Sequence, residues 1–459
     1  MHDRLRGTLA DAALWVIAAW LLALPLALPW LSDHTVHDSA RLSQAMLAAL
    51  CALAILPAAA RLRVRWPTSL LIGAGAIAFL GADRLDMAWR EAALGAGMVA
   101  VALVVATATS RRPLGWAVAA ATALYAILVL LVALLAGADA ATVQHAELVF
   151  GYANRRHFNH VQTVAFPLCV WLAATAEQRQ LRRLAALAAA CTLSLLVMTL
   201  GRATILALVI GFGVTAFVAR PTAALLWRPA AWSVGAGLVI YGLVFHLWPT
   251  AFGHAPSASA DMSIGHLAGD QSRLALWRWA FDAWREAPWF GIGPMHLSQR
   301  FNGIAGHAHS LPLQMLAEWG LVFTLIAAAL LWRFVRRLAA ASAASIEVTA
   351  LLWGVVAIAV DSLVSGNAVM PVSQVWIAVA FGWAARALRD AHPPRAADAG
   401  SAWTRRITTG VVCVVLLLPV GLAVAVLQEW PTLPAQIEAA LKQFPSPAHD
   451  PRFWSHGWF

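Results

Sequence analysis

The stretch that decides the fold runs from Leu184 to Ala219 and reads Leu-Ala-Ala-Leu-Ala-Ala-Ala-Cys-Thr-Leu-Ser-Leu-Leu-Val-Met-Thr-Leu-Gly-Arg-Ala-Thr-Ile-Leu-Ala-Leu-Val-Ile-Gly-Phe-Gly-Val-Thr-Ala-Phe-Val-Ala. Arg202 is the only charged residue in these 36 positions. As a single helix the run would be about 54 Å long, whereas the hydrocarbon core of a bilayer is about 30 Å thick. The chain must therefore turn near residues 200–204, where Gly201 permits a turn, and Arg202 is left at the edge of the membrane.

The rest of the chain repeats this apolar character. It has 459 residues, of which 61% are hydrophobic and 12% charged, and soluble domains of this size could not bury so much apolar surface. We therefore expect an all-α polytopic integral membrane protein with about 12–13 transmembrane helices. The expected spans lie at about 12–30, 42–60, 67–81, 91–109, 114–137, 158–176, 184–200, 203–219, 231–248, 311–332, 346–364, 372–388 and 407–427.

The positions of the basic residues predict the orientation. The net charge is +10, and with the N-terminus inside, 20 of the 32 basic residues fall in alternate short loops on the inner side. This pattern is topology information, so the basic balance does not indicate nucleic acid as a partner. The four cysteines all lie within apolar segments, which favours buried thiols over a disulfide framework or a metal site.

The same interpretation divides the chain into five parts. N-terminal transmembrane helices occupy residues 1–137, further helices with Arg202 at their outer edge occupy 138–248, and a large outward loop, periplasmic in a bacterial inner-membrane protein, occupies 249–310. C-terminal transmembrane helices follow at 311–427, and a short outward tail covers 428–459, too short for a folded domain.

Polar residues gather on the outer side. In the large loop, Leu274, Trp277, Phe281 and Trp284 recur at helical spacing, which predicts an amphipathic surface helix at 271–286 that Asp270 can cap. Arg273 falls in its first turn, where unpaired backbone N–H groups favour an anion, and Arg202 favours the same kind of ligand. The alternative for both arginines is contact with lipid headgroups.

Two other span ends add candidates for the same cavity. Arg155 and Arg156 precede a span that carries Asn159 and Gln162, which are i, i+3 neighbours able to share a face. Asp361 ends the eleventh span, where it either pairs with an outer arginine or lines the cavity. Helix-to-helix hydrogen bonding is the alternative for the polar residues.

The segment His307-Ala-His-Ser-Leu-Pro-Leu-Gln-Met-Leu-Ala-Glu-Trp-Gly320 leads from the large loop into a span. His307 and His309 could suggest a metal, but no acidic or cysteine ligand stands at recognised spacing, so no metal or other cofactor is expected. We interpret His309 as a general base beside arginines that hold a diphosphate, with His307 as its neighbour.

These residues carry a family resemblance. His309-Ser310, nine residues, Gly320, two residues and then Phe323 resembles the signature of bacterial O-antigen ligases, from which Phe323 departs at the last position. The run Leu313-Gln314 with Glu318 resembles a motif of the same superfamily, which includes O-antigen polymerases and protein O-oligosaccharyltransferases. Arg202 and Arg273 look like the two essential arginines of that superfamily. The resemblance covers about 155–325 by motif and the whole chain by topology.

The resemblance implies a GT-C-like membrane fold and a glycan donor on undecaprenyl diphosphate, used at the periplasmic face of the bacterial inner membrane. The substrate-binding set would then comprise Arg202, Arg273, Arg155, Arg156, Asn159, Gln162, His307, Gln314 and Asp361, with His309 catalytic. The acceptor would be lipid A-core sugar in a ligase, which we rank first, a Ser or Thr of a pilin-type protein in an oligosaccharyltransferase, or a growing glycan in a polymerase. A transporter of an anionic lipid-linked substrate is the chief alternative from another class, and a structural scaffold is a third.

Overall fold

The computed structural model describes residues 2–31, 34–62, 64, 66–138, 148–254, 271–391, 402–443 and 451–457. Within these ranges every regular element is a helix, which confirms the all-α class. Seven helical stretches are long and apolar enough to cross a membrane by length and composition, and shorter apolar helices accompany them. The protein is therefore a multi-pass membrane protein.

Each of the thirteen expected spans overlaps a helix. The helices that overlap the expected spans are α1 (His2–Leu31), α2 (Val36–Ile55), α3 (Trp66–Leu80), α4 (Leu85–Thr107), α5 (Arg112–Ala138), α6 (Arg155–Thr175), α7 (Arg179–Met198), α8 (Arg202–Val218), α9 (Arg220–Gly242), α13 (Leu311–Ser342), α14 (Ile346–Asp361), α15 (Pro371–Ala391) and α16 (Ala402–Glu429). The shorter helices outside this set include α10 (Trp248–Ala251), α12 (Gln271–Glu286) and α17 (Leu433–Gln443).

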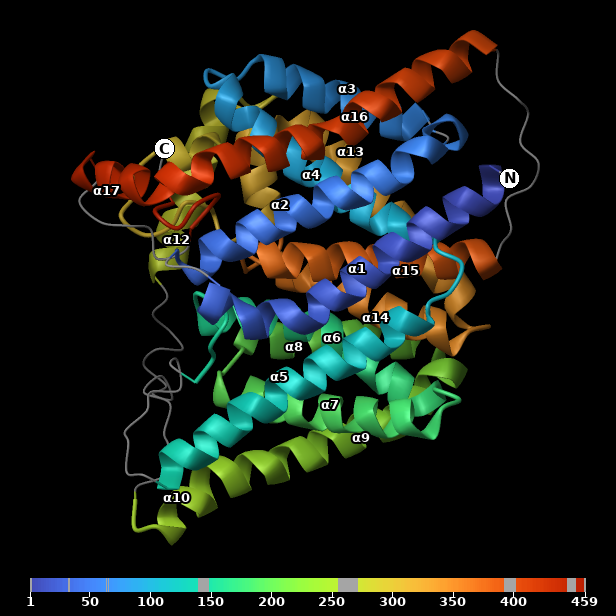
Figure 1. Cartoon of the computed structure of the whole chain (residues 1–459), viewed down its shortest axis with the longest axis vertical. Helices are drawn as coiled ribbons and strands as arrows, with labels where there is room; N and C mark the ends of the chain where they lie inside the picture. The colour runs from blue at the N-terminus through green and yellow to red at the C-terminus, as the bar shows by residue number, and fades with distance from the viewer. Residues whose placement is uncertain are drawn as a thin grey trace.

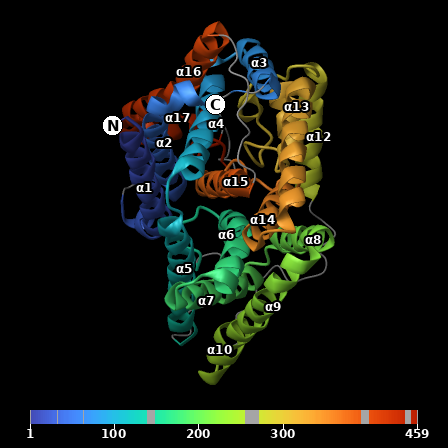
Figure 2. The same ribbon diagram turned by 90° about the vertical axis from the view of Figure 1, so that its right-hand side faces the viewer.

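The centre of the bundle is formed by α6, α14 and α15. They lie between α1 and α2 on one side and α12 and α13 on the other (Figure 2). Every residue of α6 from His157 to Val170 is buried, so this helix can carry polar side chains without exposing them to lipid. Glycines let the helices approach closely: a Cβ on Gly211 of α8 would lie 2.9 Å from the backbone oxygen of Trp353 in α14.

The helix predicted at 271–286 is present as α12, with the predicted bounds (Gln271–Glu286). Its buried stripe consists of Leu276, Ala280 and Ala283, and the two alanines pack with residues of α13 and of the loop before it. Leu274 and Phe281 are 53% and 45% exposed, so part of the expected apolar face points outward, as a helix at a bilayer surface requires. The expected cap Asp270 lies outside the described residues.

One end of the bundle collects the elements that matter for the site. The helices α12 and α17 and residues 451–457 lie at the end opposite the N-terminus (Figure 1). We call this the α12 end. The C-terminal residues do not form a separate unit there, because Phe453 and Trp454 are buried among residues of α2, α4 and α16.

Candidate functional site

The turn between α7 and α8 carries Arg202, as the length of the apolar run predicts. The helix α7 ends at Met198 and α8 begins at Arg202. Leu200, with φ of 49°, adopts the left-handed conformation, whereas Gly201 has an ordinary φ of −68°. Gly201 instead leaves room for the side chain of Asn159, because a Cβ there would lie 2.8 Å from its Nδ2 atom. The exposed Arg202 therefore follows a turn held close against α6.

The first turns of α6 form the facing wall. Asn154 caps the helix by accepting a hydrogen bond from the backbone N–H of Arg156 at 2.9 Å. One turn later, Oδ1 of Asn159 accepts a hydrogen bond from the Thr199 hydroxyl at 2.7 Å. The Thr204 hydroxyl donates to the backbone oxygen of Asn159 at 3.3 Å. Hydroxyl groups on both sides of Arg202 thus fasten its turn to α6.

The histidine segment closes the opposite side. His309 has φ of 50°, a left-handed conformation that is costly for a residue with a side chain. Its backbone N–H donates to Nδ1 of His307 at 3.2 Å, and the two ring centroids are 4.2 Å apart. Because Nδ1 accepts this bond, a neutral His307 carries its proton on Nε2. His307 is fully buried against Gly366, where a Cβ would lie 2.5 Å from its Cε1 atom.

The glycine of the histidine motif has a structural role. Gly320 interrupts α13 with φ of 78° and ψ of 176°. A Cβ there would lie 2.4 Å from the backbone oxygen of Trp289, so the segment after α12 crosses α13 at this point. The freed N–H of Leu321 donates to the backbone oxygen of Pro288 at 2.9 Å. This crossing fixes α12 relative to α13.

An ion pair also joins α12 to the loop that precedes the histidines. Arg300 donates to both carboxylate oxygens of Glu286, at 2.6 and 2.5 Å. These hydrogen bonds from Arg300 lower the pKa of Glu286 below its usual value.

Asp361 lies at the end of α14 beside the same space. Its Oδ2 atom accepts hydrogen bonds from the Thr163 hydroxyl at 3.3 Å and from Nδ2 of Asn367 at 3.2 Å. Asp361 is thus held by hydrogen bonds, and Arg273 of α12 lines the same cavity.

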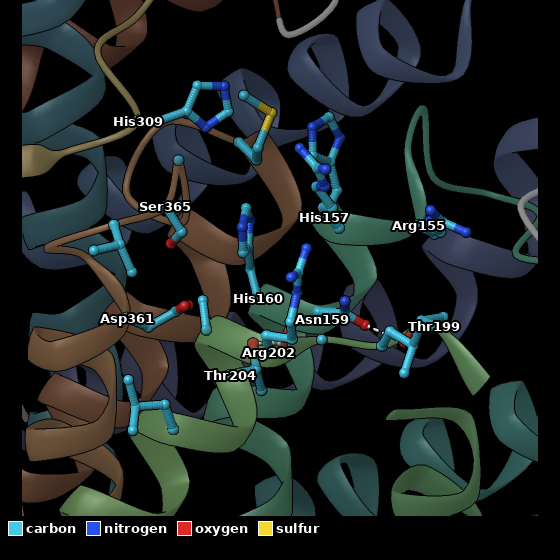
Figure 3. Close-up of a pocket in the computed structure, with 18 of the residues that line it drawn as sticks. Arg155, His157, Asn159, His160, Thr199, Arg202, Thr204, His309, Asp361 and Ser365 are labelled. Atoms are coloured by element: carbon cyan, nitrogen blue, oxygen red, sulfur yellow. Dashed lines mark hydrogen bonds between the residues drawn. The ribbon is translucent and has the colours of Figure 1, made fainter. Parts of the chain in front are cut away.

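These groups border one cavity of about 600 Å³, within the range of small-molecule sites. In Figure 3, Arg202 and His160 point into the same space, with His309 across it and Asp361 at its flank. The cavity brings together eight residues singled out from the sequence: Arg155, Arg156, Asn159, Arg202, Arg273, His307, His309 and Asp361.

Gln162 and Gln314 do not line the cavity. Gln162 lies against α7 instead, where its Nε2 donates to the backbone oxygen of Thr192 at 2.9 Å. Gln314 donates to Glu318 at 3.4 Å within α13. The sequence-based set in turn missed Thr199 and Thr204, although hydroxyls on both sides of an isolated arginine could have pointed to them.

Within the described ranges, no three His, Cys, Asp or Glu side chains are grouped as a metal site would need. What the cavity does offer is positive charge from several arginines, neutral hydrogen-bonding groups, the carboxyl group of Asp361 and the imidazoles of four histidines. Such a set can bind an anionic ligand and accept a proton from it or from a second substrate.

The comparison with known families identifies a domain within the chain. Residues 187–328 match the family described as O-antigen ligase (Wzy_C). The matched segment extends from α7 into α13 and contains Arg202, Arg273 and His309. The match confirms the resemblance found in the histidine motif. No protein with a curated description matches the chain.

Proposed function

The chain carries an O-antigen ligase-type domain at residues 187–328, a domain of lipid-linked glycan transferases, and on that premise we propose a specific reaction. The protein transfers a glycan from undecaprenyl diphosphate to a hydroxyl acceptor at the periplasmic face of the bacterial inner membrane. Lipid A-core sugar is the acceptor. His309 is the general base, and Arg202 and Arg273 bind the diphosphate.

The observation that carries the proposal is that one cavity holds Arg202, Arg273 and His309, although they come from α8, α12 and the loop before α13. Arg202 is the first residue of α8 and Arg273 lies in the first turn of α12. Both guanidinium groups therefore stand beside the positive end of a helix dipole, which favours a diphosphate between them.

In the proposed reaction, His309, Arg202 and Arg273 act directly on the two substrates. The acceptor oxygen attacks the anomeric carbon while the imidazole of His309 takes the hydroxyl proton. The bond between the anomeric carbon and the diphosphate oxygen breaks, and the electron pair leaves with the lipid diphosphate. Arg202 and Arg273 stabilise the charge that develops on this leaving group. Asp361 lines the same cavity, and its negative charge would attract Arg273.

The test is transfer by purified protein from a labelled undecaprenyl diphosphate glycan. His309→Ala should lower the rate by about 10²- to 10⁴-fold and keep donor binding. Arg202→Ala and Arg273→Ala should weaken donor binding as well. His254→Ala is the matched control, because His254 follows α10 and does not line the cavity. Undiminished product from the His309 variant would refute the role of His309 as the base, whereas donor binding without any product from the wild-type protein would leave a transporter as the better explanation.

The acceptor needs a test of its own, because the family match alone does not separate a ligase from an oligosaccharyltransferase. Offering lipid A-core and a pilin-type protein side by side tests the choice. Labelling of the protein alone would replace the ligase assignment by an oligosaccharyltransferase.

A further inference from the structure

The C-terminal segment 451–457 is held in the bundle by polar contacts as well as by burial. Arg41 of α2, itself buried, donates to the backbone oxygen of Arg452 at 2.8 Å and to that of Phe453 at 3.3 Å. Asp38 accepts two hydrogen bonds from Ser455, one from its backbone N–H and one from its hydroxyl, both at 2.7 Å. These contacts fix the path of the segment residue by residue.

The side chain of Arg452 reaches from this segment to α13. It is 1% exposed, and its guanidinium lies 2.7 Å from Glu318 and 3.0 Å from Glu91. Glu318, which is fully buried, also accepts a hydrogen bond from the backbone N–H of Leu297 at 3.2 Å. One carboxylate thus joins the C-terminal segment to the loop that leads to the histidines.

A second contact reaches the same loop nearer to His309. A Cβ on Gly306 would lie 2.6 Å from the backbone oxygen of Gly457 and 3.2 Å from Cβ of Arg452. Gly306 precedes His307 directly, so the C-terminal segment lies against the backbone that carries the imidazoles.

We propose that residues 451–457 act as a clasp that positions His309, with Arg452 as the positioning residue. This inference rests on the function proposed above. The left-handed backbone of His309 is costly and persists only when its surroundings hold it. The clasp supplies that restraint through Glu318 and Gly306. Arg452 does not line the cavity and acts only through these groups.

The experiment compares Arg452→Met with Arg452→Lys in the full chain. Loss of the buried cation leaves Glu318 without its partner, whereas lysine keeps the charge. Arg452→Met should lower kcat on the order of 10- to 100-fold while KM for the donor changes by less than about threefold, because Arg202 is held on α8 by other contacts. Arg452→Lys should recover most of the rate.

A second variant keeps the test sharp if Arg452→Met does not fold. Gly306→Ala changes no charge, but its new Cβ would crowd Gly457 and Arg452 of the C-terminal segment, so this variant should also lower kcat. Arg111→Met is the matched control, because it removes a part-buried arginine that lies between α4 and α5 and pairs with Glu347 of α14, outside the C-terminal segment.

The outcomes separate the two proposals. If the wild-type protein makes product, His309→Ala does not, and folded Arg452→Met and Gly306→Ala keep the wild-type kcat, the clasp is refuted and the proposed function stands. A change confined to the KM for the donor, with kcat unchanged, also refutes the clasp. If His309→Ala makes product at the wild-type rate, the role of His309 in the proposed function is refuted, whatever the C-terminal variants show. A fall in kcat that lysine restores supports the clasp.

Discussion

Gly201→Ala offers the sharpest test of how Arg202 is placed. The φ of Gly201 is −68°, which alanine adopts without strain, so any effect of the substitution arises from contact alone. The new Cβ would lie 2.6 Å from Cδ1 of Leu196, 2.8 Å from Nδ2 of Asn159 and 2.9 Å from its Cγ. The Leu196 methyl group can rotate away. Asn159 is buried and bonded to Thr199, so the turn has to move instead.

The size of the effect follows from these distances. Non-bonded carbon atoms prefer separations of about 3.5–4.0 Å, so the turn shifts by roughly 1 Å. Overpacking of this kind costs about 1–3 kcal/mol of stability. A displacement of about 1 Å at a positioning element lowers catalysis on the order of 100-fold. That corresponds to about 2.7 kcal/mol of lost transition-state stabilisation.

The assay is the transfer rate of purified variants together with their thermal unfolding in the same detergent. Gly213→Ala is the control, because Gly213 lies on α8, which Gly201 directly precedes, and a Cβ added there would meet nothing within 4 Å, so this variant should keep the wild-type rate. A folded Gly201→Ala protein with wild-type turnover would show that the position of Arg202 does not matter for catalysis, and the role given to the turn would be refuted.

Two further predictions concern the histidines and the charge of the site. Gly366→Ala places a Cβ 2.5 Å from Cε1 of His307 and should lower turnover about 10- to 100-fold with donor binding retained. Gly354→Ala is the control, because its nearest contact would be at 3.9 Å, and it should behave as wild type. Equal turnover rates for the two variants would contradict the role given to His307. Transfer should persist in EDTA because arginines supply the positive charge at the diphosphate, and abolition by chelation with recovery on adding Mg²⁺ or Mn²⁺ would overturn that assignment.

The helices could be predicted because bilayer thickness constrains the sequence directly. An apolar run that is too long for one span has to turn, and the turn at Gly201 is where length alone placed it. The bounds of α12 followed from its helical periodicity. Arginines that the sequence assigns to the outer side likewise stood out, because the charge bias of the loops does not explain them.

Contacts between distant segments could not be predicted in this way. No periodicity links Arg452 to Glu318, although the two side chains are 2.7 Å apart. The sequence suggested that Gly201 supplies the unusual backbone angle, but Leu200 adopts it and the glycine makes room for Asn159. Clearance and burial depend on which helices meet, and composition does not specify that.

Two strained residues border the cavity, and their placement bears on how the site works. Leu200 and His309 both have positive φ, although both carry side chains. Each conformation costs on the order of 1–3 kcal/mol, so neighbouring contacts must hold it. Leu200 is preceded by Thr199, which is fastened to Asn159, and His309 donates to a histidine packed on Gly366. The positions of the arginine and the imidazole are therefore set before a substrate arrives, which favours a preorganised site over one assembled by substrate binding.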